Sequence, residues 1–384
     1  MIDKLTYCIP YVILAIILFS LYLKEQKKLK YHHDVTGVRV TAFVLLLLFF
    51  GLRGHLYTDF VIYYRFYERV SPITEPNDFL NYFEPGFVIY SKILKTISPN
   101  YFFWIFINTF IDLFALTFVF RKYCKSTILP FIFFLAFQGV LIESNLIRNM
   151  KALDCFFFSI PYLLDRKIWK YMVWNLLGIS FHYSAIIFIP MYFILAREIP
   201  KIVVWVCLLF ANVAYWGNIH FISNLLSALI PNETLMDRVD GYMNMDRGYA
   251  FSIGYFERTM TIILFTLLYR KLYAISAATK VFYNCSLLFY LFHILCADII
   301  VFAERFSILF IIGNWVNYSN VISCKYRFKS IVNIGITILV ILKIMLSYSQ
   351  IGAKYQNVLF GVDNFNIRES EVMKEYNRSV RVAK

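Results

Sequence analysis

The chain has 384 residues, of which 60% are hydrophobic and 16% charged, and its mean hydropathy is +0.62. A soluble domain has roughly 45–50% apolar and about 25% charged residues, so this composition excludes a soluble globular protein, whose surface would carry large apolar patches. The net charge of +14 fits basic cytoplasmic loops better than a nucleic-acid surface, because no zinc-ligand spacing, helix-turn-helix pattern or basic-aromatic groove is present. At about 20 residues per span, the chain holds about ten to twelve transmembrane helices.

Apolar runs separated by short charged clusters predict the helices in chain order. The first run, residues 8–23, follows a single lysine and lacks a small-residue cleavage site, so it is interpreted as a retained helix rather than a signal peptide. Eleven further helices are expected at 38–52, 101–120, 128–142, 152–164, 171–180, 183–196, 202–216, 256–269, 281–302, 306–323 and 331–347. The segment 83–97 has the length of a re-entrant or interfacial helix.

These elements predict an all-α, polytopic membrane protein, with one transmembrane domain over 1–348 and a polar, basic tail over 349–384. Clusters of Lys and Arg follow every second predicted helix, as the positive-inside rule requires of cytoplasmic loops. The clusters lie at 24–30, 121–125, 166–170, 197–201, 270–280 and 325–329. The long loops 53–100 and 217–255, the shorter turns opposite the clusters and both termini are therefore expected on the outer side.

The seven cysteines lie in apolar stretches or at basic loop edges and form no CxxC pair, which predicts buried free thiols rather than disulfides or a metal site. The sequence also lacks a Walker loop, a GxGxxG turn, an HExxH helix and a DxD pair. A metal-dependent nucleotide-sugar transferase and an ATPase are therefore disfavoured, and we expect neither a metal nor another cofactor.

Polar residues that can do chemistry gather in the outer loops. Arg148 and Asn149 begin an apolar helix, where the arginine fork and the helix N-terminus can bind phosphate oxygens. The alternative is an interfacial arginine whose side chain extends toward the lipid headgroups. Glu304 and Arg305 interrupt two apolar runs, either with Arg305 as a second phosphate ligand that Glu304 orients or as a simple interfacial turn.

Three further candidates could act on an acceptor hydroxyl. His182 lies between two apolar stretches and suits proton transfer or a hydrogen bond to a sugar, although a structural histidine at a helix junction is the alternative. Asp59 and Glu84 are the candidate carboxylates of the first outer loop. They could act as a base or bind saccharide hydroxyls, and the alternative is that they are solvated loop charges. Tyr63 and Tyr64 offer faces for sugar rings, or belong to an interfacial aromatic belt.

The order of several short motifs resembles the EpsG family of polysaccharide polymerases and covers nearly the whole chain. The stretches that carry the resemblance are Phe-Gly-Leu-Arg-Gly at 50–54, Thr-Asp at 58–59, Tyr-Tyr at 63–64, Glu-Pro-Gly-Phe at 84–87, Ile-Arg-Asn at 147–149, Phe-His-Tyr-Ser-Ala at 181–185 and Tyr-Gln-Asn at 355–357. The sequence departs from the family's pattern at Asn149, where Gln is common, and at Lys354, where Pro is usual. Glu304 and Arg305 fit the family's late charged element only loosely.

The resemblance implies a Wzy-like polymerase of capsule, exopolysaccharide or O-antigen, multi-pass in the bacterial plasma (inner) membrane, and a GT-C-like helical bundle is compatible with it. Such an enzyme joins undecaprenyl-diphosphate-linked oligosaccharide repeat units by glycosyl transfer at the extracytoplasmic face. Substrate-binding residues, for diphosphate or sugar, would be Arg53, Arg148, Asn149, Arg305, Tyr63 and Tyr64. Asp59, Glu84 and His182 would be the catalytic candidates, without a ranking among them as general base.

The expected partners are the lipid-linked oligosaccharide, the bilayer, and also a chain-length regulator and a flippase, but no nucleic acid. Two other functions stay open: a transporter or flippase of lipid-linked saccharide, and a membrane acyltransferase that modifies glycans. The sequence shows no internal repeat, and its predicted helix centres are almost free of charge apart from Asp112, Asp298 and Lys343, which disfavours a transporter. An acyltransferase would need an acyl-donor site, which His182 alone does not make.

Overall fold

The computed structural model describes residues 4–75, 83–219, 224 and 252–382. The chain divides into two compact units, Met1–Ile189 with Lys325–Lys384, and Pro190–Cys324, which we call unit 1 and unit 2. Among the described residues the β-type pairing consists of two isolated bridges, Arg53 with Asn357 and Asn357 with Gly361. The protein is all-α, as the sequence predicts.

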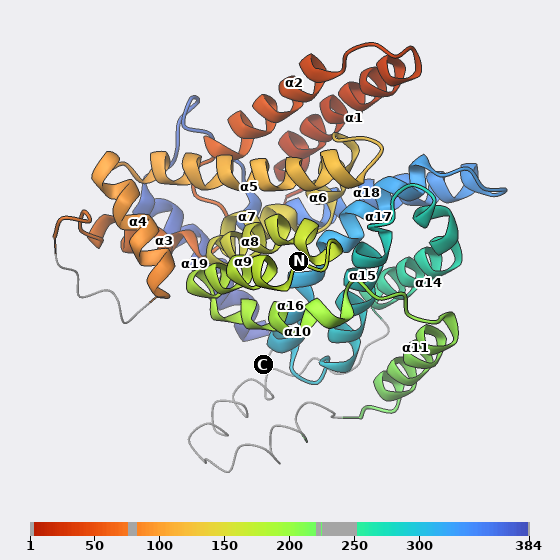
Figure 1. Cartoon of the computed structure of the whole chain (residues 1–384). Coiled ribbons are helices and arrows are strands. Elements are labelled where there is room, and N and C mark those ends of the chain that lie inside the picture. Colours follow the sequence, from red (N-terminus) through yellow and green to blue (C-terminus); the bar gives the residue numbers. More distant parts are fainter. Residues whose placement is uncertain (1–3, 76–82, 220–223, 225–251, 383–384) are drawn as a thin grey trace. The chain divides into compact units, whose positions relative to one another are not determined.

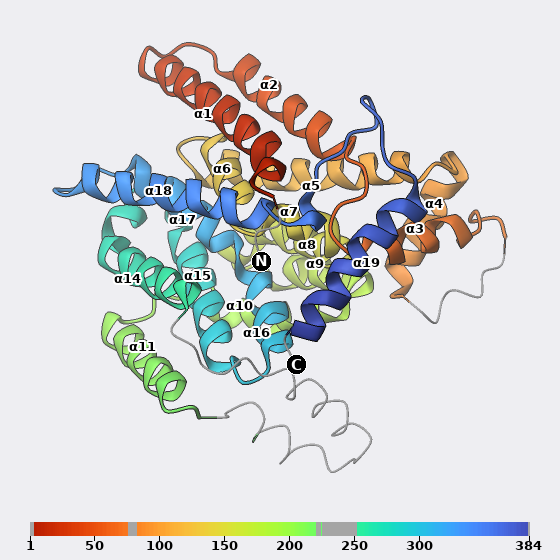
Figure 2. The ribbon, with the colours of Figure 1, turned by 180° about the vertical axis from the view of Figure 1, so that it is seen from behind.

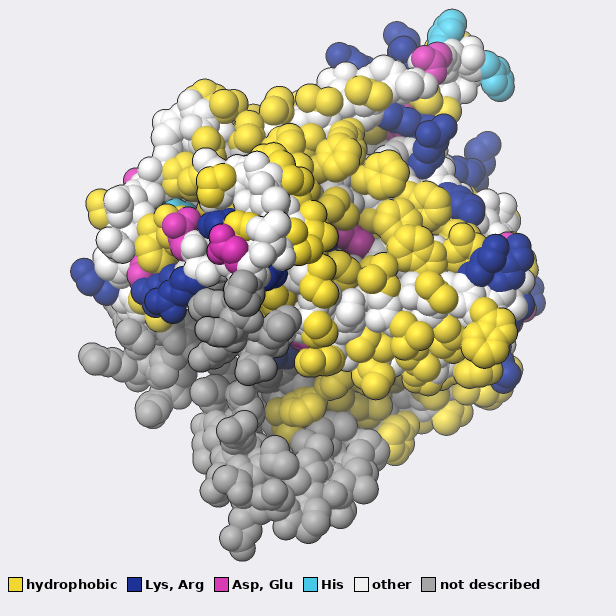
Figure 3. Space-filling model, turned by 60° about the vertical axis from the view of Figure 1, so that its left-hand side comes forward, with side chains coloured by type: hydrophobic (Ala, Val, Ile, Leu, Met, Phe, Trp, Pro, Cys, Tyr) yellow, Lys and Arg dark blue, Asp and Glu magenta, His cyan; other side chains and the backbone are white. Residues whose placement is uncertain are grey.

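Several helices are long and apolar enough to cross a membrane. These are Leu5–Lys30, Tyr101–Tyr123 and Lys329–Tyr348, and shorter apolar helices occupy Thr36–Gly51, Tyr183–Ile194 and Lys201–Trp216. On the Lys329–Tyr348 helix, isoleucines recur every three or four residues and are half-exposed or more, which marks a lipid-facing stripe. Figure 3 shows a broad field of hydrophobic side chains on the face that it draws. The polytopic membrane class is confirmed.

Unit 1 contains the N-terminal and C-terminal helices. Its elements are α1 (Ile9–Lys30), α2 (Thr36–Leu46), which a π-helical turn (Leu47–Gly51) extends, α3 (Phe60–Arg69), α4 (Pro85–Ile97), α5 (Tyr101–Tyr123), α6 (Leu129–Ala136), α7 (Gly139–Asn145), α8 (Ile147–Leu164), α9 (Ile168–Phe181), α18 (Lys329–Tyr348) and α19 (Phe365–Val382). Helices α1 and α2 lie side by side in both views (Figures 1 and 2). Helix α8 packs along α9 on one side and along α5 on another.

Unit 2 is built around α15 (Thr279–Leu295), which packs against four other helices. These are α11 (Lys201–Trp216), α14 (Ile253–Tyr273), α16 (Ile300–Ser307) and α17 (Ile312–Ser323), while α10 (Phe188–Ile194) straddles the boundary between the units. The Asn284 amide on α15 donates to the carbonyls of Leu195 (2.9 Å) and Arg197 (2.8 Å), which satisfies backbone acceptors that the end of α10 leaves unpaired.

Most predicted helices are present, but some boundaries and breaks are not where the apolar pattern suggests. The single helix expected at 128–142 is two helices, α6 and α7, because Gln138 has a left-handed backbone (φ 59°) that interrupts the helical hydrogen bonds. The helix expected at 281–302 ends at Leu295, and α16 follows as a separate piece. The segment 83–97 contains the helix α4. Helices α3 and α19 are polar on one side and were not expected from hydropathy.

The C-terminal residues, which the sequence marks only as a polar tail, form a packed part of unit 1. The Gly54 amide donates to the Gln356 carbonyl (2.9 Å), and the Val358 amide donates to the Leu52 carbonyl (2.8 Å). The Arg368 guanidinium, fully buried, donates to the carbonyls of Ile351 (2.7 Å) and His55 (3.2 Å). These hydrogen bonds bring the segment after α18 to the turn around Arg53, so both lie on one side of unit 1.

A buried charge network joins the turn around Arg53 to α5, α7 and α8. Arg53 is 2% exposed, and its Nη1 lies 3.1 Å from Glu143 Oε1 and 2.7 Å from the Thr109 hydroxyl. Its Nη2 donates to the Glu143 backbone carbonyl (2.7 Å). The Lys151 ammonium bonds to the Asp112 carboxylate, to the Asn108 carbonyl (2.8 Å) and, at 3.5 Å, to Asp154. The ionised groups are therefore paired inside the unit, as burial requires.

We expect Glu143→Ala to lower the free energy of unfolding by about 3–5 kcal/mol, because it leaves the buried Arg53 guanidinium without its carboxylate. The measurement is thermal unfolding of the purified protein in detergent. The matched control is Asp165→Asn, which breaks an ion pair to Lys167 in which both side chains are 55% exposed, and which should change stability by less than about 1 kcal/mol. Equal shifts for the two variants would contradict the structural role of the Arg53–Glu143 pair.

We also expect the packing of α19 to weaken in acid. Burial lowers the pKa of His55 to about 4, and the Arg368 guanidinium adds to the lowering. A lowered histidine pKa gives stability that is present above the unfolded value of about 6.5 and is lost as the pH falls below it, here about 2 kcal/mol between pH 7 and pH 5. The His55 ring stacks on Phe60 (4.8 Å) and meets Phe365 edge-on (5.8 Å).

The measurement is the rate of limited proteolysis of the C-terminal segment as a function of pH. His55→Phe should remove the pH dependence, whereas His32→Gln, in the exposed turn after α1, should leave it unchanged. A pH dependence that survives in the His55 variant would assign it to another group.

Candidate functional site

The candidate site of unit 1 is centred on an ion pair between Arg148 and Glu84. Arg148 lies in the first turn of α8, and its Nη1 is 2.6 Å from Glu84 Oε2. The Arg148 side chain is 25% exposed and that of Glu84 only 5%. The guanidinium also stacks 4.6 Å over the Phe83 ring. The cation is thus held in a defined orientation while part of its fork remains accessible.

The position of Glu84 depends on a close approach between two helices. Glu84 is the last residue before α4, and Pro85 takes the first helical position, where its missing N–H costs nothing. A Cβ atom on Gly86 would lie 2.1 Å from the Ser180 hydroxyl and 2.8 Å from the Ser180 carbonyl. Only glycine at position 86 therefore lets the start of α4 reach the end of α9. The Glu-Pro-Gly motif is explained by this geometry.

The end of α9 brings His182 to the same carboxylate. His182 Nε2 lies 4.0 Å from Glu84 Oε1, and the Tyr183 amide donates to that oxygen at 3.3 Å. His182 Nδ1 accepts the Ser184 amide (3.2 Å), so in the neutral ring the proton sits on Nε2, facing Glu84. The Ser184 hydroxyl is 2.7 Å from Nδ1 and accepts from the Asn149 amide at 3.3 Å. Arg148, Asn149 and His182 therefore belong to one hydrogen-bonded cluster.

Asp59 and Tyr63 join this cluster through Asn145. The Asn145 side-chain oxygen accepts the backbone amides of Thr58 (3.2 Å) and Asp59 (3.1 Å), the two residues directly before α3, and so holds the chain where this helix starts. Asp59 is half-buried, and its Oδ1 accepts the Thr58 hydroxyl (3.0 Å). The Tyr63 hydroxyl donates to the Asn145 carbonyl (3.4 Å) and interacts with Arg148. Burial raises the pKa of Tyr63, so its hydroxyl stays a donor at neutral pH.

Other sequence candidates lie elsewhere. Arg53 is buried in the charge network, with both terminal nitrogens bonded to protein groups. Tyr64 stacks on Phe365 of α19 at 4.4 Å, outside the Arg148–Glu84 cluster. Arg305 is exposed on α16, in unit 2, so its relation to Arg148 stays a prediction. The binding roles of these residues stay predictions.

Some residues of the cluster were not singled out from the sequence. Asn145 binds the amides of Thr58 and Asp59. Ser184 links Asn149 to His182, and Phe83 provides the ring on which Arg148 stacks. Asn145 lies three residues before Arg148, and Ser184 belongs to the Phe-His-Tyr-Ser-Ala stretch, so position in the motifs was the available signal. Arg258, on α14 of unit 2, interacts electrostatically with Glu257 and Glu304. The hydropathy pattern does not single it out, because Arg258 falls at the edge of the apolar helix predicted at 256–269.

The described residues contain no group of three or more His, Cys, Asp or Glu side chains that could hold a metal ion. The seven cysteines are all free. The chemistry that the cluster itself offers is a partly exposed guanidinium for an anion, with carboxylates, an imidazole and amide donors around it.

We expect Gly86→Ala to lower the free energy of unfolding by about 1–3 kcal/mol, because the added methyl group pushes α4 away from α9. Thermal unfolding in detergent measures this. Gly335→Ala, on α18, is the matched control: its Cβ would meet nothing within 4 Å, and alanine should stabilise the helix slightly. If both variants unfolded at the wild-type temperature, the close approach at Gly86 would not constrain Glu84.

The comparisons with known proteins give a family but no near relative. The model of the EpsG family matches residues 38–359, a range that contains every member of the Arg148–Glu84 cluster. No curated protein and no solved structure matches the chain. The EpsG family comprises Wzy-like polysaccharide polymerases, membrane proteins that resemble glycosyltransferases. Since the match covers far more than half of the sequence, this chain belongs to the EpsG family.

Proposed function

We propose that this protein polymerises polysaccharide by joining undecaprenyl-diphosphate-linked oligosaccharide repeat units at the extracytoplasmic face of the bacterial plasma membrane. The family implies a membrane polymerase of this general type. The single observation that carries the finer proposal is the Arg148–Glu84 cluster: a half-buried, oriented guanidinium surrounded by groups that can engage hydroxyls. The positive-inside pattern predicts the outer side for every loop that contributes to it.

The reaction needs a cation where negative charge develops. The acceptor hydroxyl attacks the anomeric carbon of the donor, the bond from that carbon to the diphosphate oxygen breaks, and the diphosphate leaves with the electron pair. Arg148 is suited to bind the diphosphate, because its planar fork matches phosphate oxygens. A quarter of its side chain is exposed, so part of the fork remains accessible to the substrate. Electrostatic stabilisation of this kind is commonly the largest catalytic contribution.

The geometry suggests different roles for the three proton-accepting candidates. Glu84 is buried and bonded to Arg148, which suits a residue that orients the guanidinium. His182 presents an N–H toward Glu84 when neutral, which suits a donor. Asp59 is more exposed than Glu84 and its backbone is held by Asn145, so we assign it as the group that accepts the acceptor hydroxyl's proton.

The buried charge network that joins Arg53 to α5, α7 and α8 supports a second candidate function. Buried Asp, Glu and Lys side chains within membrane helices often mark a transport pathway, and Asp112, Lys151 and Asp154 are all 3% exposed or less. We favour the polymerase because Lys151 and Arg53 bind protein carbonyls as well as carboxylates, which suits fixed structural pairs. A flippase of lipid-linked saccharide would use the same substrate, so the deciding experiment must separate the two.

The experiment is deletion of the gene, followed by complementation with variants at matched protein levels. Without a polymerase, single lipid-linked repeat units should accumulate on the outer face, where an added glycosidase reaches them in intact cells. Units confined to the cytoplasmic face would indicate a flippase instead. Normal polymer in the deletion strain would reject both functions.

Among the variants, we expect Arg148→Ala to lower polymer formation by about 10²–10³-fold, since it removes the charge at the leaving diphosphate. Arg148→Lys should recover only part of the activity, because it restores the charge without the fork. Arg65→Ala is the control: Arg65 is on α3 of the same outer loop, 54% exposed, and paired with Glu369. Polymer of unchanged amount and length in Arg148→Ala would disprove the assigned phosphate role.

A further inference from the structure

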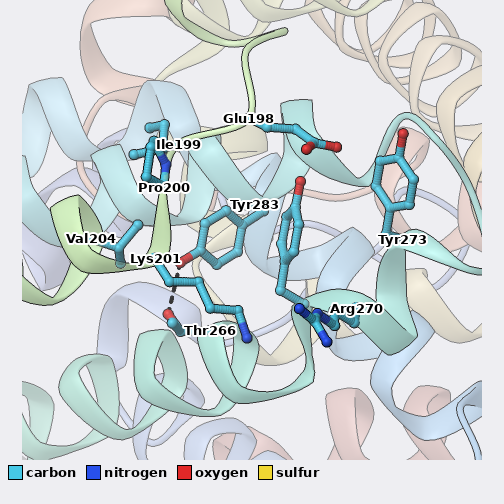
Figure 4. A pocket seen from close by; sticks show the side chains of 10 residues that line it. Glu198, Ile199, Pro200, Lys201, Val204, Thr266, Arg270, Tyr273 and Tyr283 are labelled. Atoms are coloured by element: carbon cyan, nitrogen blue, oxygen red, sulfur yellow. Dashed lines mark hydrogen bonds between the residues drawn. The ribbon is translucent and has the colours of Figure 1, made fainter.

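A pocket of unit 2 lies where α11 begins, α14 ends and α15 begins. Its cavity volume is about 520 Å³. The polar side chains that line it are those of Glu198, Lys201, Thr266, Tyr269, Arg270, Tyr273 and Tyr283, with Ile199, Pro200 and Val204 beside them (Figure 4). All of these residues lie at or near the ends of α11, α14 and α15, so the pocket is at the ends of these helices rather than at their centres.

Two basic clusters that are far apart in the sequence converge on this pocket. Lys201 belongs to the cluster 197–201, and Arg270 to the cluster 270–280. The positive-inside rule predicts the cytoplasmic side for each cluster separately. The structure places both cations on one cavity. The pocket is therefore expected at the depth of the lipid headgroups of the cytoplasmic leaflet.

The pocket contains polar groups that the protein leaves unused. In the part of unit 2 that the structure describes, the Lys201 ammonium and the Arg270 guanidinium form no hydrogen bond or ion pair. The Tyr269 hydroxyl is buried and has no partner within hydrogen-bond distance there. Buried hydroxyls are nearly always bonded. By contrast, the Tyr283 hydroxyl is satisfied by the Thr266 hydroxyl at 2.8 Å, the dashed line in Figure 4.

We propose that this pocket binds the phosphodiester of an anionic phospholipid whose headgroup carries hydroxyls, the phosphatidylglycerol class. In Figure 4 the ends of Lys201 and Arg270 are at the lower edge of the pocket, where they can share one phosphate. The Glu198 carboxylate is at the upper edge, where it can accept a headgroup hydroxyl. The unpaired Tyr269 hydroxyl donates to a remaining phosphate oxygen.

The charge of the pocket selects this class. Two cations and one carboxylate leave a formal charge of +1, which matches a phosphodiester better than a doubly charged phosphate monoester. The apolar side chains of Ile199 and Val204 extend the pocket toward the region of acyl chains. A free phosphate would use only the cations and would leave Glu198 as a repulsive neighbour.

The test uses purified full-length protein in nanodiscs of defined composition, with bound lipids counted by native mass spectrometry. We expect wild-type protein to retain phosphatidylglycerol in preference to phosphatidylcholine. Lys201→Gln and Arg270→Gln should each weaken retention by about tenfold, roughly the equivalent of one lost charge-assisted hydrogen bond. Glu198→Gln should reduce the preference for phosphatidylglycerol over phosphatidic acid, whose phosphate is a monoester.

The matched control is Lys271→Gln, which removes the same charge from the same end of α14 without touching the pocket. It should retain lipid as the wild type does, and all variants should unfold at the wild-type temperature. Equal loss in Lys271→Gln would mean general surface attraction and would overturn the proposal. So would displacement of the lipid by excess inorganic phosphate, which would indicate a site for the free ion. The assay involves no polymerisation, so its outcome is independent of the proposed activity.

Discussion

The buried ion pair between Arg53 and Glu143 is the interaction on which the rest of unit 1 depends. A guanidinium that is 2% exposed needs a carboxylate and backbone acceptors, and Glu143 provides both, through its side chain and its own carbonyl. Thr109 adds the link to α5. The requirement to neutralise one charge therefore fixes the end of the α2 segment, α5 and α7 together.

The position of the candidate site depends on these buried charges. Glu143 lies on α7 just before Asn145, which holds the start of α3 and hence Asp59. Lys151 ties α8 to α5 one turn after Arg148, so the helix that presents Arg148 cannot rotate without breaking a buried pair. A half-buried cation in the first turn of a helix that is held in place is suited to binding an anion. Arg53 and Arg148 thus lie in different environments, one enclosed by protein groups and the other partly exposed.

The opening and closing motifs of the chain form one structural element. Asn357 pairs with Arg53 as an isolated bridge, and its amide bonds the Leu48 carbonyl (3.1 Å) and the Tyr355 hydroxyl (2.8 Å). The Tyr355 hydroxyl in turn bonds the Phe49 carbonyl (2.8 Å) and its ring stacks on Phe49 at 4.1 Å. Carbonyls freed by the π-helical turn of α2 are thus satisfied by residues about 300 positions away, a requirement that is strict near lipid.

The sequence by itself determined the membrane class and most helices, because hydropathy and charge are local properties. Its short motifs also named Arg148, Glu84 and His182 as candidates, and the structure brings these three residues together. The sequence could not distinguish Arg53 from Arg148, because both lie at the ends of apolar runs. Only the tertiary structure shows that Glu143 and Thr109 enclose Arg53, whereas the Arg148 side chain remains 25% exposed. The break at Gln138 and the return of the C-terminal segment were also decided by packing. Which cation is buried depends on partners 56 and 90 residues away, and such partners leave no periodic signal in the chain.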